Sequence, residues 1–250
     1  MLKLPILYQD DWLVAINKPA GLLVHRSLID KHETQFAVQL VRDQIGQKVY
    51  PVHRLDRPTS GMLLFALDAA TARAVTDQFT QGLVLKTYSA LVRGFCELAG
   101  VIDYALKEEL DEIADTKADP NKPAQSALTH YRTLEQFELP FASSKHPTSR
   151  YSLLELRPKT GRRHQLRRHL KHIFHPIVGD TTHGDGKQNK LFREQFSCER
   201  LLLHAQALQV QHPISKEALN LQAPLADEFV QVLQSVASKH LMVGNSNVYT

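Results

Sequence analysis

The chain has 250 residues, of which 43% are hydrophobic and 22% charged, with only 11 Gly and 12 Pro. This composition excludes disordered, collagen-like and low-complexity proteins, and a chain of this length buries roughly 70–75% of its unfolded surface without needing disulfides or a structural metal. Lys and Arg exceed Asp and Glu by four, a modest excess that predicts a strong local field only if the charge is clustered.

The first part of the chain predicts four strands, each a short run of apolar or β-branched residues bounded by turn residues. These strands span residues 6–8, 12–18, 62–67 and 84–92. Two helices are predicted between them. Apolar residues at helical spacing indicate one within 34–45, which Gly46 would end, and Asp68 is placed to cap the other, which Gly82 would end.

The second part of the chain predicts three further strands and two further helices. The strands span residues 128–137, 151–156 and 203–210. One helix is predicted directly after residue 162, and the other covers 225–236. An acidic segment spans about 107–122, residues 120–123 mark a loop, and another loop is predicted at 140–148. Many strands with few helices, and no regular alternation of strand and helix, predict an α+β fold with a mainly antiparallel or mixed sheet.

The charge of the chain is unevenly distributed. Residues 157–175 contain seven Lys or Arg, four His and no acid, whereas residues 103–119 contain seven acids and two Lys. A cluster of cations concentrates positive potential at one face, which predicts that a polyanion binds there.

A carboxylate between two arginines is the strongest chemical signal. Asp56 lies between Arg54 and Arg57 in the segment HRLDRPTSG, on a predicted turn beside a buried strand. The flanking positive charge is expected to keep Asp56 ionised in a cleft, which suits a nucleophile or a general base. The alternative is a structural turn in which Asp56 pairs with an arginine to fix the loop.

Two further signals lie outside this turn. In KTGRRHQLRRHL (159–170), a glycine turn opens a predicted helix on which Arg163 and Arg167 share a face, an arrangement that suits a phosphate or a buried acid. The alternative is a solvated basic surface. Tyr88, on a predicted strand, can stack on a base and supply a phenol, although simple packing is the alternative.

The histidines of the basic segment do not predict a metal site. They are His164, His169, His172 and His175. The segment has no HExxH pattern and no carboxylate nearby in the sequence, and its seven cations oppose a divalent ion. Residues 179–185 lack the order of a phosphate-binding loop, so we interpret them as a structural turn.

The segment at 53–61 resembles the signature of the RluA-type pseudouridine synthases. Four companion segments resemble further motifs of that family in the right order: KPAGLLVH (18–25), KTY (86–88), TGRRHQLRRH (160–169) and HPIVGD (175–180). The resemblance spans about residues 12–210 and implies the pseudouridine synthase fold, isomerisation of a uridine in RNA and no cofactor.

The resemblance also implies roles for individual residues. Asp56 matches the catalytic aspartate, Tyr88 the active-site tyrosine, Arg167 the basic partner of that aspartate, and Arg54 the arginine that enters the RNA helix where the base leaves. Arg163 stands where many relatives have Ser or Thr, which is expected to alter backbone contacts rather than the chemistry. The residues expected to bind RNA are Lys18, Arg54, Arg57, Arg162, Arg163, His164 and Arg168.

The expected substrate is tRNA, with uridine 65 in the T-arm as the target. This expectation rests on a start that lacks an S4-type RNA-binding domain and on residues 41–47, 108–115 and 167–169, which resemble family members that act on tRNA. Three alternatives remain open: a ribosomal RNA pseudouridine synthase, a non-catalytic RNA-binding or RNA-folding protein, and a metal-dependent hydrolase.

The organisation of the chain is expected to be simple. We expect one catalytic domain over 1–237, with an acidic insertion at about 107–122 and a loosely ordered tail at 238–250. Two cysteines are too few for a disulfide framework, and the chain shows no signal peptide and no apolar run of membrane-spanning length. We therefore expect a cytoplasmic monomer with no membrane association and no obligate protein partner.

Overall fold

A computed structural model describes residues 3–25, 34–109, 122–142 and 146–241. Within these ranges the strands are β1 (Ile6–Gln9), β2 (Leu13–Lys18), β3 (Tyr50–Pro51), β4 (Ser60–Ala66), β5 (Leu85–Arg93), β6 (Ala99–Asp103), β7 (Leu128–Leu139), β8 (Ser149–Pro158), β9 (Leu203–Gln211) and β10 (Ala218–Gln222). The helices are α1 (Ala37–Ile45), α2 (Ala69–Thr80), α3 (Gln165–His172), α4 (Gly186–Phe196) and α5 (Asp227–Ser238).

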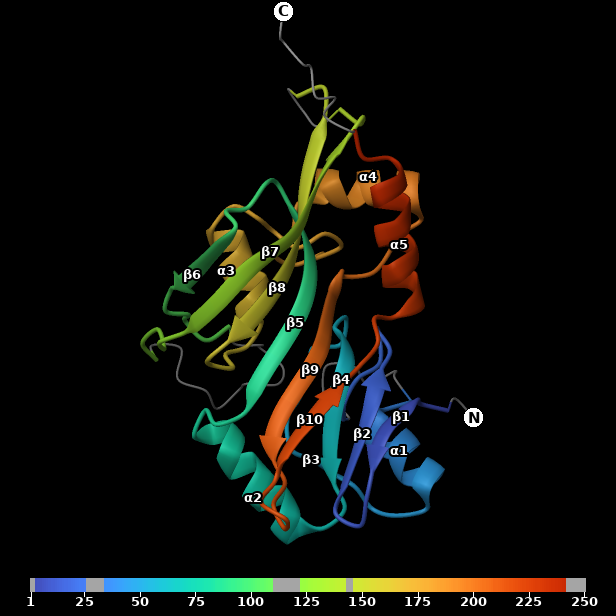
Figure 1. The fold of residues 1–250 in the computed structure, drawn as a ribbon, viewed down its shortest axis with the longest axis vertical. Helices are drawn as coiled ribbons and strands as arrows, with labels where there is room; N and C mark the ends of the chain where they lie inside the picture. Colours follow the sequence, from blue (N-terminus) through green and yellow to red (C-terminus); the bar gives the residue numbers. More distant parts are fainter. Residues whose placement is uncertain (1–2, 26–33, 110–121, 143–145, 242–250) are drawn as a thin grey trace, which may run out of the picture.

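The strands of the described residues form one sheet, in the order β1-β2-β4-β9-β5-β8-β7-β6 (Figure 1). Strand β3 pairs with β4, and β10 pairs with β9. Among these pairings, β4 with β9 is parallel and the others are antiparallel. The predicted α+β fold with a mixed sheet is therefore confirmed.

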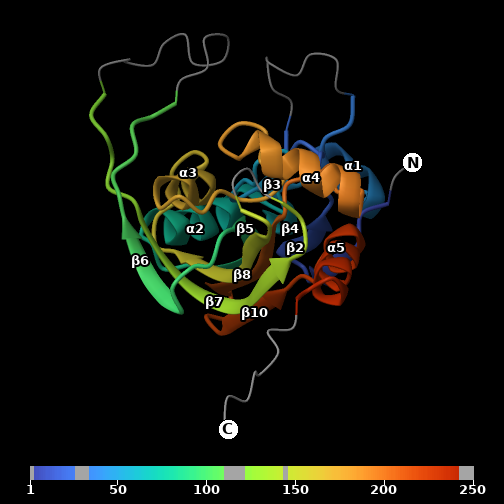
Figure 2. The same cartoon turned by 90° about the horizontal axis from the view of Figure 1, so that it is seen from above.

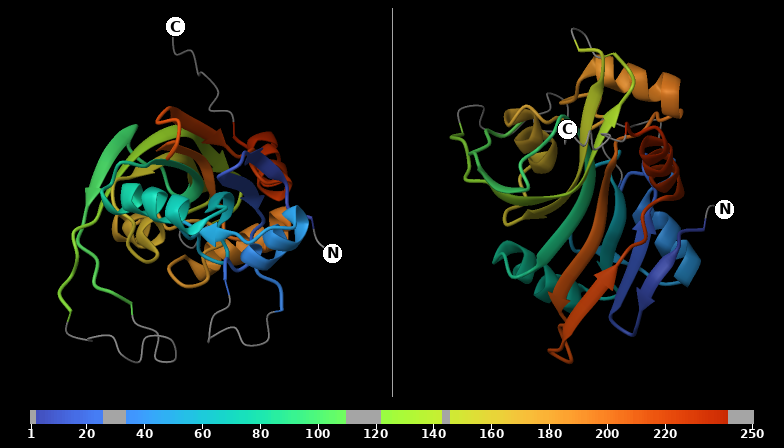
Figure 3. Two further views of the ribbon diagram at one scale, coloured as in Figure 1. Left: turned by 90° about the horizontal axis from the view of Figure 1, so that it is seen from below. Right: turned by 45° about the horizontal axis from the view of Figure 1, so that its top comes forward.

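The sheet is curved, and four helices cover one of its sides. Figure 2 shows α1, α2, α3 and α4 on the same side, with α5 beside one edge. The right view of Figure 3 shows α4 (orange) next to α5 (red), and the two helices are in contact. Across the described part of the chain, no helix combines the length and apolar character that crossing a bilayer requires.

Three clusters of buried side chains hold the helices on the sheet. One joins β2 and β4 to α1 and α2, a second joins β5 and β8 to α3, and a third joins β7 and β8 to α4 and α5. Every residue of β4 is buried, as its continuous apolar run predicted. The strands that surround the Asp56 turn and Tyr88 are thus anchored in the core.

The predicted helix signals at 46 and 68 are confirmed in detail. Gly46 ends α1 with a φ of 69°, and its N–H donates to the carbonyl of Arg42. The carboxylate of Asp68 accepts a hydrogen bond from the N–H of Thr71 and so caps α2.

Four elements were not predicted from the sequence: β3, β6, α4 and β10. Helix α4 is rich in polar side chains and buries few residues, so its amphipathic pattern is weak. It begins where Asp185 accepts hydrogen bonds from the N–H groups of Lys187 and Gln188, and Phe192 anchors it in the core. The predicted insertion at about 107–122 and the tail at 238–250 lie largely outside the described residues.

Candidate active site

Asp56 lies in the loop that enters β4. The N–H of Thr59 donates to the carbonyl of Asp56 and closes the turn at 3.0 Å. The Asp56 side chain is 23% exposed, and its Oδ2 lies 3.4 Å from Nη1 of Arg167 and 3.9 Å from Nε2 of His164. The structure therefore brings Asp56, Arg167 and His164 together.

The main partner of Arg167 is a carboxylate that sequence reasoning did not select. Nε and Nη2 of Arg167 donate to the two oxygens of Asp180 at 2.7 and 2.8 Å, a bidentate pair. Burial alone would raise the pKa of Asp180, but hydrogen bonds from Arg167 and from the N–H groups of His183 and Thr182 lower it. The turn at 179–185 is structural, as predicted, and it also supplies the carboxylate that fixes Arg167.

Asp56 lies where two cavities meet. The larger cavity has a volume of about 1300 Å³ and the smaller about 710 Å³. Both are lined by Arg54, Asp56, Arg163, His164 and Arg167. A partly exposed carboxylate thus faces space large enough for a substrate and is surrounded by cations.

Tyr88 and Lys86 line the smaller cavity from β5. In the sheet order β9 alone separates β5 from β4, so Tyr88 lies near the loop that enters β4. Burial, together with the negative charge of Asp56, raises the pKa of the Tyr88 phenol, so the hydroxyl stays protonated at neutral pH. Tyr88 therefore offers the cavity an aromatic face and a protonated phenol.

The two arginines that flank Asp56 are exposed but differently placed. Arg54 lines both cavities, so its side chain borders the space in front of Asp56. Nε of Arg57 donates to the carbonyl of Gly21 at 3.1 Å, and this bond ties the Asp56 turn to the segment after β2.

The expectation that Lys18 binds RNA is wrong. Its side chain is fully buried, and Nζ donates to the carbonyls of Pro19, Leu22 and Arg57 at 2.9, 2.7 and 3.2 Å. Burial lowers the pKa of Lys18 to about 7. Through these three hydrogen bonds, Lys18 instead joins the segment after β2 to the Asp56 turn.

The prediction that Arg163 and Arg167 share a face of one helix is also wrong, because α3 begins only at Gln165. The Gln165 side chain accepts from the N–H of Arg162 and the hydroxyl of Thr160, which holds the preceding turn in place. His164 at the N-cap has a φ of 53°, a left-handed conformation that is rare outside Gly and is found at functional sites.

The remaining predicted RNA-binding residues surround this turn and contact other segments. Arg162 and Arg163 are exposed. Nε of Arg162 donates to the carbonyl of Ser126, and Nη1 of Arg163 donates to the carbonyl of Glu109. Nε of Arg168 lies 3.4 Å from Oε1 of Glu109. The basic segment is therefore in contact with the beginning of the acidic one.

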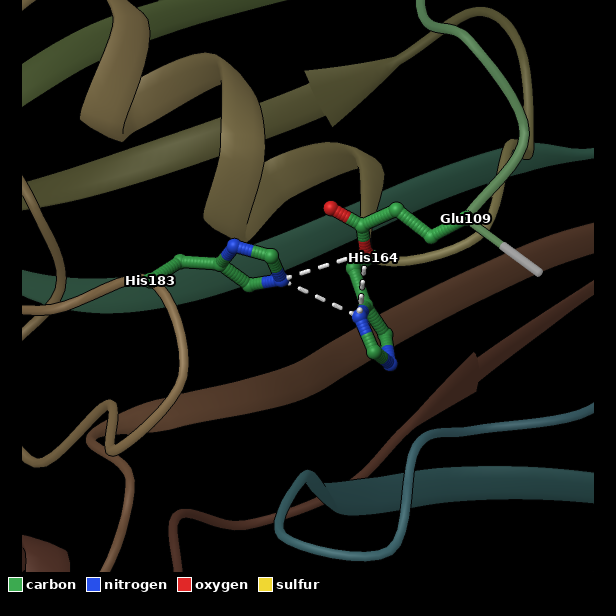
Figure 4. A group of neighbouring side chains, drawn as sticks. All are labelled: Glu109, His164 and His183. Atoms are coloured by element: carbon green, nitrogen blue, oxygen red, sulfur yellow. Dashed lines mark hydrogen bonds and ion pairs between the residues drawn. The ribbon is translucent and has the colours of Figure 1, made fainter. Parts of the chain in front are cut away.

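Three of the four histidines of the basic segment have partners outside the site, and the fourth joins a cluster beside Asp56. The ring of His169 contacts Thr129 and the carbonyl of Tyr104, His172 stacks on Tyr104, and Nδ1 of His175 contacts the carbonyl of Arg93. His164 instead lies against Glu109 and His183 (Figure 4).

Sequence reasoning missed Glu109, Asp180, His183, Lys86 and Arg200, which lie in or beside the site. Lys86 and Asp180 lie in segments that resemble family motifs (86–88 and 175–180), and Glu109 lies in 108–115, but none of the three was given a role. His183 falls in a segment interpreted as a turn, and no local pattern marks Arg200. The guanidinium of Arg200 donates to the hydroxyl of Ser60 and lines the larger cavity.

Known proteins share both the sequence and the fold of this chain. Residues 12–172 match the RNA pseudouridylate synthase family. The protein named tRNA pseudouridine synthase C of Vibrio cholerae serotype O1 is 59% identical over 232 residues, which are 93% of this chain and 95% of that protein. The protein of the same name from Haemophilus influenzae is 51% identical over 230 residues, which are 92% and 96% of the two chains.

Among solved structures, Human RNA Pseudouridylate Synthase Domain Containing 4 has a TM-score of 0.70 and 29% identity, covering 93% of both chains. The family match includes the Asp56 turn, Tyr88 and the start of α3. Because the full-length relatives also cover most of the chain, the motif at 53–61 was interpreted correctly, and the protein belongs to the RNA pseudouridylate synthase family.

Proposed function

We propose that this pseudouridine synthase acts on tRNA and isomerises uridine 65 of the T-arm. The observation that carries the proposal is Asp56, which lies between two cavities among cations, in a chain 51–59% identical to proteins named tRNA pseudouridine synthase C. The choice of uridine 65 rests on the resemblance of residues 41–47, 108–115 and 167–169 to family members that act on tRNA.

The reaction exchanges one bond for another and needs no external reagent. The bond between C1′ of the ribose and N1 of uracil breaks, the base turns, and a bond forms between C1′ and C5. The proton lost from C5 is balanced by the proton gained at N1, so no oxidant, reductant or cofactor is consumed. The chain therefore has to supply a nucleophile or base, a stacking surface and a route for one proton.

We assign the first of these tasks to Asp56. Its carboxylate either attacks the sugar or the pyrimidine ring, or assists elimination of the base to give a glycal. In each case the carboxylate form reacts, and Nη1 of Arg167 lies 3.4 Å from Oδ2 of Asp56. Tyr88 borders the same cavity, so we assign it stacking on the uracil and a part in the proton transfer.

The target base must leave the RNA stack before it reaches Asp56, which costs a few kcal/mol. We propose that Arg54 fills the gap that the flipped base leaves in the RNA stack, because its exposed side chain borders both cavities. The exposed Arg57, Arg162 and Arg163, with Arg168, would neutralise phosphates around it, and the ring of His164, whose pKa is lowered by burial, would offer a hydrogen bond. Binding should then weaken steeply with salt.

We further propose the organisation that the sequence indicated. The catalytic domain would cover 1–237, since α5 ends at Ser238 and packs into the same core as β7 and β8. The protein would act as a monomer in the cytoplasm, with tRNA as its substrate and no obligate protein partner. Analytical ultracentrifugation of the purified protein would test the monomer.

The decisive experiment maps pseudouridine position by position in unmodified tRNA transcripts treated with wild-type protein, Asp56→Asn or Asp43→Asn. The last variant is a matched control, because Asp43 pairs with Arg42 on the surface. We expect a signal at uridine 65 with wild type and the control, and none with Asp56→Asn, which should fold and bind RNA normally.

Each other outcome has a defined meaning. A signal at another uridine keeps the enzyme and rejects the proposed target. A signal only in ribosomal RNA supports the ribosomal alternative. Product formed by Asp56→Asn at the wild-type rate rejects the role of Asp56, and binding without product in any RNA supports a non-catalytic protein.

A further inference from the structure

Glu109, His164 and His183 come from three separate segments and bring three ligand atoms into a compact triangle (Figure 4). Nδ1 of His164 lies 3.2 Å from Oε2 of Glu109 and 3.1 Å from Nε2 of His183. Nε2 of His183 lies 3.5 Å from the same oxygen. His183 is buried, and the other two residues are partly exposed.

These separations match those between ligands of a tetrahedral zinc ion. Zn²⁺ binds imidazole nitrogen and carboxylate oxygen at about 2.0–2.2 Å, so two ligands of one ion lie about 3.3–3.5 Å apart. Two His and one acidic residue, with a fourth position open to water, form a known zinc ligand set. Mg²⁺ and Ca²⁺ prefer oxygen ligands throughout, so the two imidazoles select zinc over these ions.

The other contacts of the cluster leave the three ligand atoms available. Arg168 approaches Oε1 of Glu109, whereas the imidazoles face Oε2. Asp56 lies 3.9 Å from Nε2 of His164, the ring nitrogen that is not part of the triangle. A carboxylate on that side of the ring orients metal-binding histidines in other proteins.

The charge around the cluster does not exclude a cation. The sequence argument against a metal rested on seven cations with no carboxylate near them in the sequence. In the fold, Asp180 compensates Arg167, and Glu109 lies between Arg168 and the two imidazoles. Glu109 thus brings the carboxylate that sequence proximity lacked.

We propose that Glu109, His164 and His183 bind one Zn²⁺ ion, and that this ion inhibits the enzyme. Zinc would fix the Glu109 carboxylate beside Arg168 and occupy His164. It would also hold the backbone of Glu109 where its carbonyl accepts from Arg163. Arg163 and Arg168, which already contact Glu109, would then stay paired with it instead of binding phosphates. The inhibition rests on the proposed function, whereas the binding of zinc does not.

The binding is tested by titrating protein freed of metal with ZnCl₂ against a chromophoric chelator. We expect one ion per chain, and an affinity at least about tenfold lower in Glu109→Gln and in His183→Asn. Glu109 is 40% exposed, so its replacement does not endanger folding, and circular dichroism checks both variants. His130→Gln is the matched control, because His130 lies on β7 and lines a separate surface cavity.

The inhibition is tested by measuring the rate of pseudouridine formation in tRNA transcripts with ZnCl₂ and with excess EDTA. For each variant, the rate with ZnCl₂ is divided by the rate with EDTA. We expect zinc to lower the wild-type rate reversibly and to leave the ratio close to one in Glu109→Gln and His183→Asn. Binding that is absent, or equal in the variants, overturns the site, and binding without inhibition overturns the regulation. If no transcript is modified in EDTA, the proposed function fails, while the titration still decides the zinc site.

Discussion

Arg167 binds the buried carboxylate of Asp180 through two parallel hydrogen bonds and leaves Nη1 3.4 Å from Asp56. The side chains of Arg167 and Asp180 are 5% and 1% exposed, so each charge is compensated mainly by the other. One guanidinium therefore contacts both the buried carboxylate of Asp180 and the partly exposed carboxylate of Asp56. Folding and the position of Asp56 are coupled through this arginine.

This relationship predicts that Asp180→Asn destabilises the fold much more than Asp56→Asn. Removing one partner of a buried ion pair leaves the other charge uncompensated, so we expect Asp180→Asn to lower the free energy of unfolding by roughly 3 kcal/mol. Asp56→Asn should lower it by less than about 1 kcal/mol, since its pairing is longer and more exposed. Urea denaturation at neutral pH measures both values.

Asp43→Asn again provides the surface control, with an expected loss below about 1 kcal/mol. If Asp56→Asn cost as much stability as Asp180→Asn, Arg167 would be anchored equally by both carboxylates. The pairing of Arg167 with Asp56 that the resemblance implied would then contribute as much to stability as the pairing with Asp180, and the expected difference between the two carboxylates would be wrong.

Tyr88→Phe is expected to retain RNA binding and to lose most of the turnover. The variant keeps the ring that would stack on the base and removes the hydroxyl of a residue that lines the same cavity as Asp56. Positioned proton transfer contributes roughly 10²–10⁴-fold to a rate, and we expect a loss in that range. Single-turnover rates of pseudouridine formation, with tRNA affinity measured separately, distinguish the two roles.

Tyr131→Phe is the matched control for this experiment, because Tyr131 lies on β7 and lines a different cavity. It should leave both rate and affinity at wild-type values. A wild-type rate in Tyr88→Phe would limit Tyr88 to stacking and packing, and Tyr88→Ala should then reduce affinity and stability instead.

Gly61→Ala is expected to destabilise the protein by more than about 3 kcal/mol. Gly61 has a φ of +112°, and a Cβ there would overlap the backbone of Ala205 in the parallel pairing of β4 with β9. Relief of the overlap would have to separate two central strands directly after the Asp56 loop. Thermal and urea unfolding of the variant measure the loss.

Gly186→Ala serves as the control, because an added Cβ there meets no atom within 4 Å. Gly186 is the first residue of α4, where Ala is the better helix former, so the change should be neutral or stabilise by up to about 1 kcal/mol. Equal losses in the two variants would show that the close approach to Ala205 is not the cause.

The sequence predicted the elements whose stability is local. The apolar run of β4 and the capping residue Asp68 determine structure through neighbouring residues, so both were found close to their true positions. Strand β6 has no such signal, because it is short and largely exposed and forms by pairing with β7. Helix α4 depends on the cap by Asp185 and on the burial of Phe192, which a polar sequence does not reveal.

The site was predicted in part for the same reason. Asp56 and Arg167 lie in motifs, and the fold brings them together across 111 residues. No local sequence pattern shows that a lysine is buried. From the sequence, Lys18 was expected to be an exposed cation at the end of a strand, yet its Nζ is enclosed by three carbonyls. The contact of Glu109 with His164 spans 55 residues and exists only in the folded chain.

The stability of the protein in acid should depend on His204, which lies on β9 and is fully buried. Nδ1 of His204 lies 2.8 Å from Oγ of Ser60, and Nε2 lies 3.4 Å from the carbonyl of Ala223. Ser60 also accepts from Arg200, and its own proton can be donated to Nδ1, which suits a neutral ring whose Nε2 carries the proton. Burial accordingly lowers the pKa of His204 to about 4.

Because the unfolded chain binds this proton more tightly than the folded one, stability is lost as pH falls from about 6.5 towards 4. Between about pH 7.5 and pH 5 the loss from His204 alone should be roughly 2 kcal/mol in the free energy of unfolding. In His204→Gln, urea denaturation at the two pH values should show a change smaller by that amount, although the variant is less stable at both. His146→Gln, on an exposed loop, should keep the wild-type dependence, and an unchanged dependence in His204→Gln would show that other groups cause the loss in acid.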